Sequence, residues 1–253
     1  MMNIFLAGAT GSMGQKVVHL LADKPGYDIT GILTSKTDVN PSDYNLSADV
    51  RVFNSLDSIE GYYDVWIDFT QPNVVFDNVK YAIEHHISPI VGTSGLSEDQ
   101  KQELINLANG ENVNGLIAAN FGLSAVLLMK FAQQAAKYFS DVEVIEMHHE
   151  DKTDSPSGTA IHTVDMMSET KQGENINQED EPARGMYYKG VPVHAVRLPG
   201  YVAHEQVLFG GPGEALTIRQ DSFDRESFMQ GVWVALEKLP ELHGLVDGLE
   251  NIL

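Results

Sequence analysis

Residues 3–14 read Asn3-Ile4-Phe5-Leu6-Ala7-Gly8-Ala9-Thr10-Gly11-Ser12-Met13-Gly14, an apolar run followed by glycines spaced three residues apart. A helical pattern follows from Gln15 to Ala22, and a second strand is predicted from Tyr27 to Leu33. A strand, a glycine turn, a helix and a second strand in this order are what a dinucleotide-binding βαβ unit requires, because the glycines let the backbone approach a pyrophosphate at the helix N-terminus. We therefore predict a dinucleotide site at Gly8, Ala9, Thr10, Gly11, Ser12 and Met13.

The residues after the second predicted strand bear on the choice of cofactor. NAD-binding proteins commonly have an Asp or Glu here that binds the adenosine ribose, whereas this chain has Thr34, Ser35 and Lys36. Hydroxyl groups and one cation can accommodate a 2′-phosphate, and no carboxylate at this place repels it. We predict that these three residues contact the cofactor and that NADPH is accepted, while the preference between NADPH and NADH stays open.

The alternating pattern continues through the N-terminal half. Strands are predicted at 64–70, 88–91 and 115–118; Gln71-Pro72 is expected to begin a helix that runs to about His85, and a Ser-x-x-Gln box at 97–100 caps the next helix. Alternating strands and helices predict a parallel sheet with helices on both faces, and such sheets bind ligands beyond the carboxyl ends of their strands. The turns on that rim add further predicted cofactor residues: Phe69, Thr70, Gly92, Thr93, Ser94, Ala118, Ala119, Asn120 and Phe121.

A second motif, residues 146–160, reads Glu-Met-His-His-Glu-Asp-Lys-Thr-Asp-Ser-Pro-Ser-Gly-Thr-Ala. His148 and His149 end an apolar strand, so their side chains should point to opposite faces, and a turn could bring the Lys152 ammonium back over the imidazole. Ser155-Pro156 predicts an N-cap with proline at the first helical position, before a helix that runs through Met167. Its start, with Gly158 and Thr159, suits a carboxylate or a phosphate.

Each part of this motif has a plainer explanation when it is taken alone. A pair of adjacent histidines is more often structural than catalytic, and a single lysine is more often a surface charge. The presence of both beside a helix start, in a chain that also carries the dinucleotide motif, favours a reaction site.

The C-terminal half has a different pattern. Strand-like segments at 142–149, 191–198, 202–209 and 215–222 follow one another without regular helices between most of them, and they predict an open mixed sheet. The polar and acidic stretch Glu169–Arg184 is the best candidate for a mobile connection, and Phe228–Leu239 is predicted to be a helix.

These motifs together resemble the dihydrodipicolinate reductase family, also called 4-hydroxy-tetrahydrodipicolinate reductases, of bacterial diaminopimelate and lysine biosynthesis. The resemblance covers nearly the whole chain. Its most specific part is His-His-x-x-Lys-x-Asp-x-Pro-Ser-Gly-Thr-Ala at 148–160, which departs from the common form only at Ser155, where alanine is usual. The remaining matches are Gly8–Gly14, Asp68-Phe69-Thr70 with Pro72, Val91–Gly95, Ala119–Phe121, Val196–Gly200 and Phe209–Glu214.

The resemblance implies a fold and a role for each matching residue. The fold is α/β: a Rossmann-type parallel-sheet domain from residues 1–121 and 223–253, which binds the dinucleotide, and an α+β domain with an open mixed sheet from residues 122–222, which binds the substrate and forms a homotetramer. His148 would donate and accept a proton, and Lys152 would protonate the substrate opposite the incoming hydride. His149, Gly158 and Thr159 would bind the substrate's carboxylates, and NADPH or NADH would lie among Gly8–Met13, Gly92–Ser94 and Ala118–Phe121.

Composition limits the possible partners. Thirty-six acidic against sixteen basic residues give a net charge of −20, which repels nucleic acid and anionic membranes. Both expected ligands are also anions, so added salt could help them bind. Without cysteine, disulfides and thiolate metal sites are excluded, and the other histidines lack ligand spacing, so no metal site is expected. No leader segment or long apolar span is recognised, which favours the cytoplasm.

Two alternatives from other classes remain open. One is a different nicotinamide-dependent dehydrogenase, of the homoserine or aspartate type, although such enzymes lack the His-His-x-x-Lys motif. The other is a non-catalytic NAD(P)-sensing regulator, which would have no reason to retain His148, Lys152 and Gly158-Thr159 together.

Overall fold

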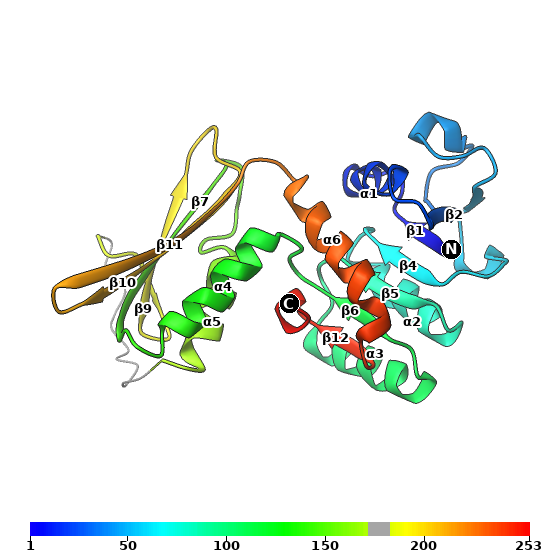
Figure 1. Cartoon of the computed structure of the whole chain (residues 1–253). Coiled ribbons are helices and arrows are strands. Elements are labelled where there is room, and N and C mark those ends of the chain that lie inside the picture. Colours follow the sequence, from blue (N-terminus) through cyan, green and yellow to red (C-terminus); the bar gives the residue numbers. More distant parts are fainter. Residues whose placement is uncertain (172–182) are drawn as a thin grey trace. The chain divides into compact units, whose positions relative to one another are not determined.

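The computed structural model describes residues 1–171 and 183–253, which form two compact units (Figure 1). Unit 1 consists of Met1–Phe121 and Phe228–Leu253, and unit 2 of Gly122–Ser227. The chain therefore returns to unit 1 five residues later than the predicted boundary at 223. Most of the stretch that was predicted to be a mobile connection, Glu169–Arg184, lies outside the described residues.

Unit 1 is built on a sheet in which every strand pair is parallel, as predicted for a Rossmann-type domain. Its strand order is β12-β6-β5-β4-β1-β2-β3. The strands are β1 (Met2–Ala7), β2 (Tyr27–Leu33), β3 (Arg51–Phe53), β4 (Val65–Asp68), β5 (Ser88–Val91), β6 (Gly115–Ile117) and β12 (Leu245–Asp247). The order reverses at β1, which has β2 on one side and β4 on the other, so the carboxyl end of β1 is the expected ligand position.

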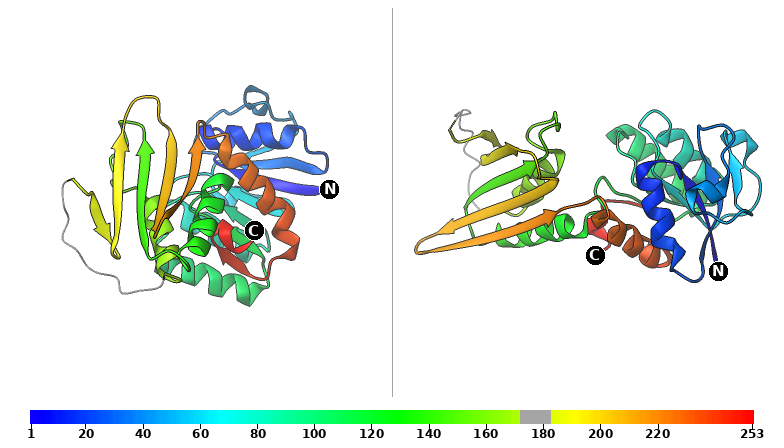
Figure 2. Two further views of the ribbon diagram at one scale, coloured as in Figure 1. Left: turned by 60° about the vertical axis from the view of Figure 1, so that its left-hand side comes forward. Right: turned by 90° about the horizontal axis from the view of Figure 1, so that it is seen from above.

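Helices cover both faces of this sheet (Figures 1 and 2). They are α1 (Ser12–Ala22), α2 (Val75–Glu84), α3 (Glu98–Glu111) and α6 (Ser227–Lys238), with short 3₁₀ turns η1 (Pro41–Tyr44), η2 (Leu56–Ser58), η3 (Leu239–Glu241) and η4 (Leu249–Asn251). On α2, Val75, Val79 and Ile83 recur every four residues and pack with Leu104 of α3 over β5, β6 and β12. This burial fixes α2 and α3 on one face.

Two of the predicted helix starts in unit 1 have different outcomes. The capping box of α3 is confirmed: Ser97 Oγ accepts from the Gln100 N–H at 3.2 Å, and the Gln100 side chain accepts from the Ser97 N–H at 3.0 Å. The prediction that α2 begins at Gln71-Pro72 was wrong. Val74 has φ −125°, outside the helical range, so the Gln71 carbonyl closes a separate turn and the helix begins at Val75.

Unit 2 contains the predicted open mixed sheet, in the order β11-β10-β7-β9-β8. Its strands are β7 (Asp141–His148), β8 (Met186–Tyr188), β9 (Val191–Arg197), β10 (Ala203–Gly211) and β11 (Glu214–Ser222). Among the described strands of this unit, only the β7–β9 pair is parallel. The helices α4 (Leu123–Ala135) and α5 (Gly158–Ser168) pack against each other on one face of the sheet (Figure 1).

Some elements were not predicted. α4 was missed although its sequence carries the apolar run Leu123 to Met129, and Ala125, Val126, Leu128 and Met129 are buried. The strands β3, β8 and β12 have three residues each, which is too short for a periodicity to be recognised.

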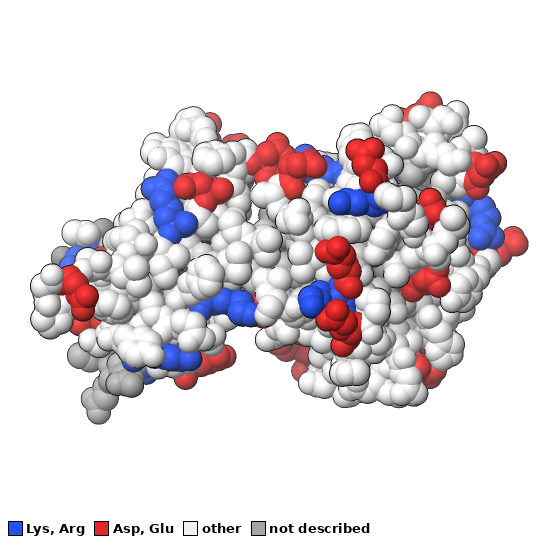
Figure 3. All heavy atoms as spheres, in the orientation of Figure 1, with Lys and Arg blue, Asp and Glu red and all other residues white. Residues whose placement is uncertain are grey.

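The surface carries charges of both signs. On the face drawn in Figure 3, acidic and basic side chains are interspersed, and the described residues form no extended basic patch there. None of the helices in the described part of the chain combines the length and apolar character that crossing a bilayer would demand.

Candidate active site

The glycine turn after β1 leaves no room for side chains. Gly8 has φ +85°, and a Cβ there would lie 2.2 Å from the Phe69 carbonyl oxygen. A Cβ on Gly14 would lie 2.2 Å from the carbonyl oxygen of Gly8. Gly11 is the N-cap residue of α1 and has no side chain to cover the first N–H groups of the helix. The turn therefore has the close backbone approach and exposed helix start that a pyrophosphate requires.

A cavity of about 560 Å³ opens at the carboxyl ends of β1 to β4. It brings together the following predicted cofactor residues: Gly8, Thr10, Gly11, Thr34, Ser35, Lys36, Phe69 and Thr70. The hydroxyls of Thr10 and Thr34 are hydrogen-bonded at 3.1 Å, which ties the glycine turn to the end of β2. Lys36, the cation expected near a 2′-phosphate, lines the cavity, and its ammonium donates to the Tyr44 hydroxyl at 3.1 Å.

The other predicted cofactor residues do not line this cavity. Ala9 is fully buried, Ser12 and Met13 begin α1, and Gly92–Ser94 and Ala118–Phe121 follow β5 and β6 on the same sheet edge. Position 92 requires glycine for a steric reason, because a Cβ there would lie 2.2 Å from the Phe69 ring. Asn54 was not predicted. It lines the cavity and donates to the carbonyls of Thr34 and Lys36 at 2.9 and 2.8 Å.

Asp68 organises the loops that follow β4 and β5. It is fully buried, and its carboxylate accepts from the Thr93 hydroxyl at 2.7 Å, the Thr70 hydroxyl at 2.6 Å and the Asn78 amide at 2.9 Å. The Thr93 hydroxyl in turn accepts from the Thr70 N–H at 2.7 Å. Thr93 and Thr70 are therefore held by a buried carboxylate. The sequence motif contained Asp68, but nothing in its spacing predicted this role.

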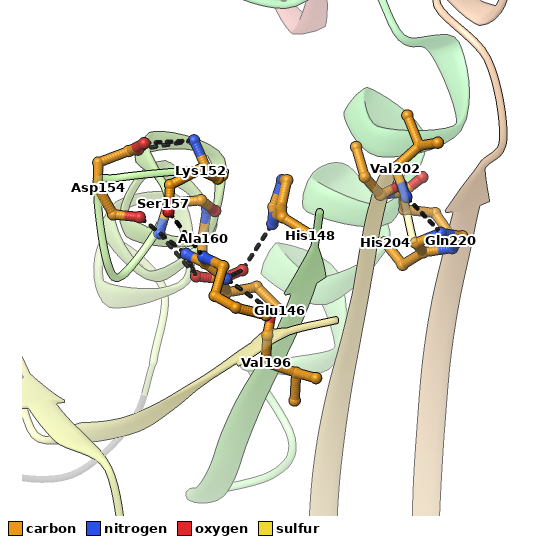
Figure 4. Close-up of polar contacts among 12 residues, drawn as sticks. Glu146, His148, Lys152, Asp154, Ser157, Ala160, Val196, Val202, His204 and Gln220 are labelled. Carbon is orange, nitrogen blue, oxygen red and sulfur yellow. Dashed lines mark hydrogen bonds and ion pairs between the residues drawn. The ribbon is translucent and has the colours of Figure 1, made fainter. Parts of the chain in front are cut away.

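In unit 2, the predicted reaction motif is organised by a buried carboxylate, Glu146 (Figure 4). Glu146 has no exposed side-chain surface, and it contacts His148 Nδ1 at 2.6 Å. Arg197, from β9, donates to both of its oxygens at 2.7 Å, and the Ser157 N–H donates at 3.0 Å. Burial by itself would raise the pKa of Glu146, but the hydrogen bonds and charges of His148 and Arg197 outweigh burial and lower that pKa. The carboxylate thus fixes the orientation of the His148 ring.

Arg197 also holds the loop that carries Lys152. Its guanidinium donates to the carbonyl of Lys152 at 3.3 Å and to that of Asp154 at 2.7 Å. The sequence contained Arg197 within a matching segment, but its pairing with Glu146 spans 51 residues and no local pattern indicates it.

The Lys152 ammonium does not lie over the imidazole of His148, in contrast to the prediction. Its ammonium pairs with Asp154, at 2.6 and 2.8 Å from the two carboxylate oxygens (Figure 4). The turn does form, because the Lys152 N–H donates to the His149 carbonyl at 3.2 Å, but a carboxylate two residues further on is the nearer partner. The hydrogen bond from Lys152 lowers the pKa of Asp154, and the backbone at Asp154 and Gly158 contributes.

The helix start beside this loop lies two residues later than predicted. The N-cap is Ser157, whose hydroxyl accepts from the Ala160 N–H at 3.2 Å, and α5 begins at Gly158. Ser155 is not the cap, because the Ser157 N–H is already bound to Glu146 and its hydroxyl is placed to close the first turn. Gly158 is exposed and a Cβ there would meet nothing within 4 Å, so a ligand can approach it closely; His149 is also exposed. In the described part of the chain, no group of three His, Asp or Glu side chains is arranged to hold a metal ion.

These features define a class of protein. One is a parallel sheet with a glycine turn at its switch point, and the other is a second unit that places a histidine, a lysine and a helix start together. They are the parts of a two-domain, nicotinamide-dependent oxidoreductase that acts on an anionic substrate.

Comparison with known proteins gives the family. The family descriptions "Dihydrodipicolinate reductase, N-terminus" and "Dihydrodipicolinate reductase, C-terminus" match residues 2–121 and 124–253. The chain is 57% identical over 255 residues to the 4-hydroxy-tetrahydrodipicolinate reductase of Lactobacillus acidophilus, covering 99% of this chain and 98% of that protein. The enzyme of the same name from Limosilactobacillus fermentum is 53% identical, with both chains covered completely. The chain belongs to the dihydrodipicolinate reductase family.

A solved structure agrees over the full length. The dipicolinate-bound dihydrodipicolinate reductase of Paenisporosarcina sp. TG-14 is 40% identical, with a TM-score of 0.88, and covers 100% of both chains. An amine dehydrogenase from Mycobacterium smegmatis has a TM-score of 0.68 at 12% identity, a likeness that concerns the fold alone.

Proposed function

We propose that the chain reduces 4-hydroxy-tetrahydrodipicolinate to tetrahydrodipicolinate with NADPH or NADH, in diaminopimelate and lysine biosynthesis. One observation carries the proposal: Glu146 and Arg197 hold His148, the Lys152 loop and the start of α5 together, on the motif that the family shares. The names of the full-length relatives support the same reaction.

The residues of unit 1 fit a dinucleotide. Gly8 and Gly14 leave backbone exposed where a side chain would collide, and the cavity offers the hydroxyls of Thr10 and Thr34 and the ammonium of Lys36. We assign the pyrophosphate to the glycine turn and the adenosine ribose or its 2′-phosphate to Thr34, Ser35 and Lys36. The nicotinamide cofactor supplies a hydride when it is bound. Gly92–Ser94 and Ala118–Phe121 complete the assignment on the same sheet edge.

The residues of unit 2 fit a planar dicarboxylate. The N–H groups at the start of α5, at Gly158 and Thr159, bind one carboxylate with help from the helix dipole. His149 and Lys152 bind the other, with the substrate replacing Asp154 as the partner of the ammonium. The pairing with Asp154 supports this assignment, because the ammonium already donates to a carboxylate in the geometry that the loop provides.

The reduction also requires a proton. The 4-hydroxyl group of the substrate leaves as water, which gives a conjugated imine. Hydride addition to that imine leaves electron density that takes up a proton, and Lys152 is the cationic donor in this loop, with His148 as proton donor and acceptor. Glu146 keeps the His148 ring oriented, since a buried carboxylate lies 2.6 Å from Nδ1.

We further propose that the enzyme is a cytoplasmic homotetramer. β11 is an edge strand, and residues 214–217 are exposed on both faces of the sheet, which leaves backbone groups available to a second copy. Light scattering coupled to size exclusion tests this: a mass four times that of the chain supports it, and a monomer contradicts it.

Activity is tested by following nicotinamide absorbance with substrate made from pyruvate and aspartate semialdehyde by the preceding enzyme. We expect substrate-dependent loss of absorbance with NADPH, NADH or both. Homoserine with the oxidised cofactors, and aspartate semialdehyde with phosphate, are run alongside. Turnover of those compounds, with none of the expected substrate, would identify a dehydrogenase of the homoserine or aspartate type. A folded protein that binds the cofactor but turns over nothing would be a sensor.

A further inference from the structure

A second buried carboxyl lies beside Glu146. In the sheet of unit 2, Glu146 on β7 is the direct cross-strand partner of Glu205 on β10, and Glu205 is the partner of Gln220 on β11. Direct cross-strand partners share a face of the sheet, so these side chains form one row. Glu205 is 2% exposed. Two carboxyl groups are thus buried next to each other on the face that α5 covers.

The two carboxyls differ in how well their surroundings stabilise a negative charge. Glu146 has Arg197, His148 and the Ser157 N–H, whereas Glu205 Oε1 has no hydrogen-bond partner among the described residues. Gln220 does not bind this oxygen: its amide oxygen accepts from Ser124 and Ser222, and its amide nitrogen donates to the Ala203 carbonyl. A second negative charge at this place would be buried beside the first, which disfavours the ionised form of Glu205.

The balance of the surrounding groups places the titration of Glu205 near neutrality. Burial raises the pKa of Glu205 to about 7; the charge of Glu146 on β7 raises it as well, whereas the side chains of Thr163 and His162 on α5 lower it. Gln220 on β11 is uncharged. The remaining charged groups nearby, Arg197 and His148, are bound to Glu146.

Glu205 is connected to the proposed substrate site through one side chain. Its carboxyl is hydrogen-bonded to Thr163, and the Thr163 hydroxyl donates to the Thr159 carbonyl at 3.0 Å. Thr163 is fully buried, and Thr159 belongs to the first turn of α5, where the proposed function places a substrate carboxylate. A negative charge beneath that turn would oppose the N–H groups and the helix dipole that attract the anion.

We propose that Glu205 is a positioning residue of the substrate site that must carry a proton for the dicarboxylate to bind tightly, so that ligand binding takes up a proton. This inference rests on the proposed function. By linkage, a bound dianion raises the affinity of Glu205 for its proton by the same factor by which the proton strengthens binding. The affinity therefore falls as Glu205 ionises, by up to about tenfold for each unit by which the ligand raises its pKa.

The test measures dipicolinate binding to the NADPH-loaded enzyme as the pH rises from one unit below to one unit above about 7. The comparison is between wild type, Glu205→Gln, which keeps the shape without the titration, and Glu214→Gln, which removes an exposed carboxylate of the same unit. Infrared difference spectra of the wild type are recorded on adding dipicolinate, because a protonated carboxyl absorbs where histidines and carboxylates do not.

We expect the dissociation constant to rise with pH more steeply in wild type and Glu214→Gln than in Glu205→Gln, and a carboxylic acid band to grow on binding. Equal slopes in all three proteins, or no such band in the wild type, would overturn the inference. The infrared result decides alone if Glu205→Gln does not fold. Dipicolinate that fails to bind the wild type at any pH, in an enzyme without activity, would instead contradict the proposed function.

Discussion

Arg197 holds the proposed proton donor through backbone carbonyls and the imidazole through Glu146. Its planar group makes two parallel bonds to Glu146 and two more to the carbonyls of Lys152 and Asp154, which a lysine cannot reproduce. We expect Arg197→Lys to lower kcat by roughly tenfold to a hundredfold, because small displacements of catalytic groups have effects of this size. Steady-state kinetics and circular dichroism check this.

The matched control for Arg197→Lys is Arg219→Lys. Arg219 makes a similar forked contact with Asp221 in the same unit, at an exposed position. The control should retain its activity, and equal losses in both variants would mean that general destabilisation explains the effect.

The buried carboxyl of Glu205 should also make the free energy of unfolding depend on pH. The unfolded chain releases its Glu205 proton near the ordinary pKa of 4.5, whereas the folded chain keeps it until about 7. The contribution of this group to the free energy of unfolding is therefore complete below pH 4.5 and is lost as pH rises to about 7. Relative to wild type, Glu205→Gln should gain up to roughly 3 kcal/mol between about pH 5 and about pH 8, as measured by urea unfolding. A constant difference across that range would contradict this.

The sequence predicted a reaction site at His148, His149, Lys152, Gly158 and Thr159 because they are close together in the chain. It could not reveal that Glu146 and Arg197 join them, since that contact depends on β7 and β9 becoming neighbours. It also misplaced the Lys152 ammonium, because the competition between an imidazole and the nearer Asp154 carboxylate is decided by the loop's three-dimensional course.

At the scale of the elements, the turn between β1 and α1 depends on a glycine within the helix. A Cβ on Gly14 would lie 2.2 and 2.7 Å from backbone atoms of Gly8 and Ala9, which cannot move without opening the turn. We expect Gly14→Ala to lower the free energy of unfolding by about 1–3 kcal/mol and to weaken NADPH binding. Thermal unfolding and cofactor fluorescence measure both effects.

Gly110→Ala is the control for this substitution. Gly110 lies in α3, and an added Cβ there would meet nothing within 4 Å. The change should stabilise the protein by about 0.5–1 kcal/mol, because alanine is the better helix former. If both variants behave alike, the packing argument for Gly14 fails.

Elements with a strong period or a cap were predictable, and those without were not. The alternation of strands and helices in unit 1 and the Ser97 capping box follow from local sequence. The three-residue strand β12 was missed because its place in the sheet comes from pairing with β6, far away in the chain. The start of α5 was misassigned because two serines flank Pro156, and only the contact of Ser157 with Glu146 selects the second.

At the scale of the whole molecule, a net charge of −20 opposes the arrival of two anionic ligands. Salt screens this long-range repulsion more than it screens the short contacts within the site. We expect kcat/KM for the dicarboxylate to rise as ionic strength increases from about 10 mM to about 150 mM. The assay is repeated with sodium and potassium chloride, and a fall in kcat/KM with both salts would show that local positive charge dominates.

The central claim is that Lys152 donates a proton in a nicotinamide-dependent reduction. Its most direct test compares substrate-dependent NADPH oxidation in wild type, Lys152→Ala and Lys189→Ala, with the cofactor dissociation constant measured for each. Lys189 is the matched control because it is also paired with an aspartate, Asp165, in the same unit. The account predicts that turnover collapses in Lys152→Ala while cofactor affinity stays nearly unchanged, and that Lys189→Ala remains active. Unimpaired turnover in Lys152→Ala would contradict the account.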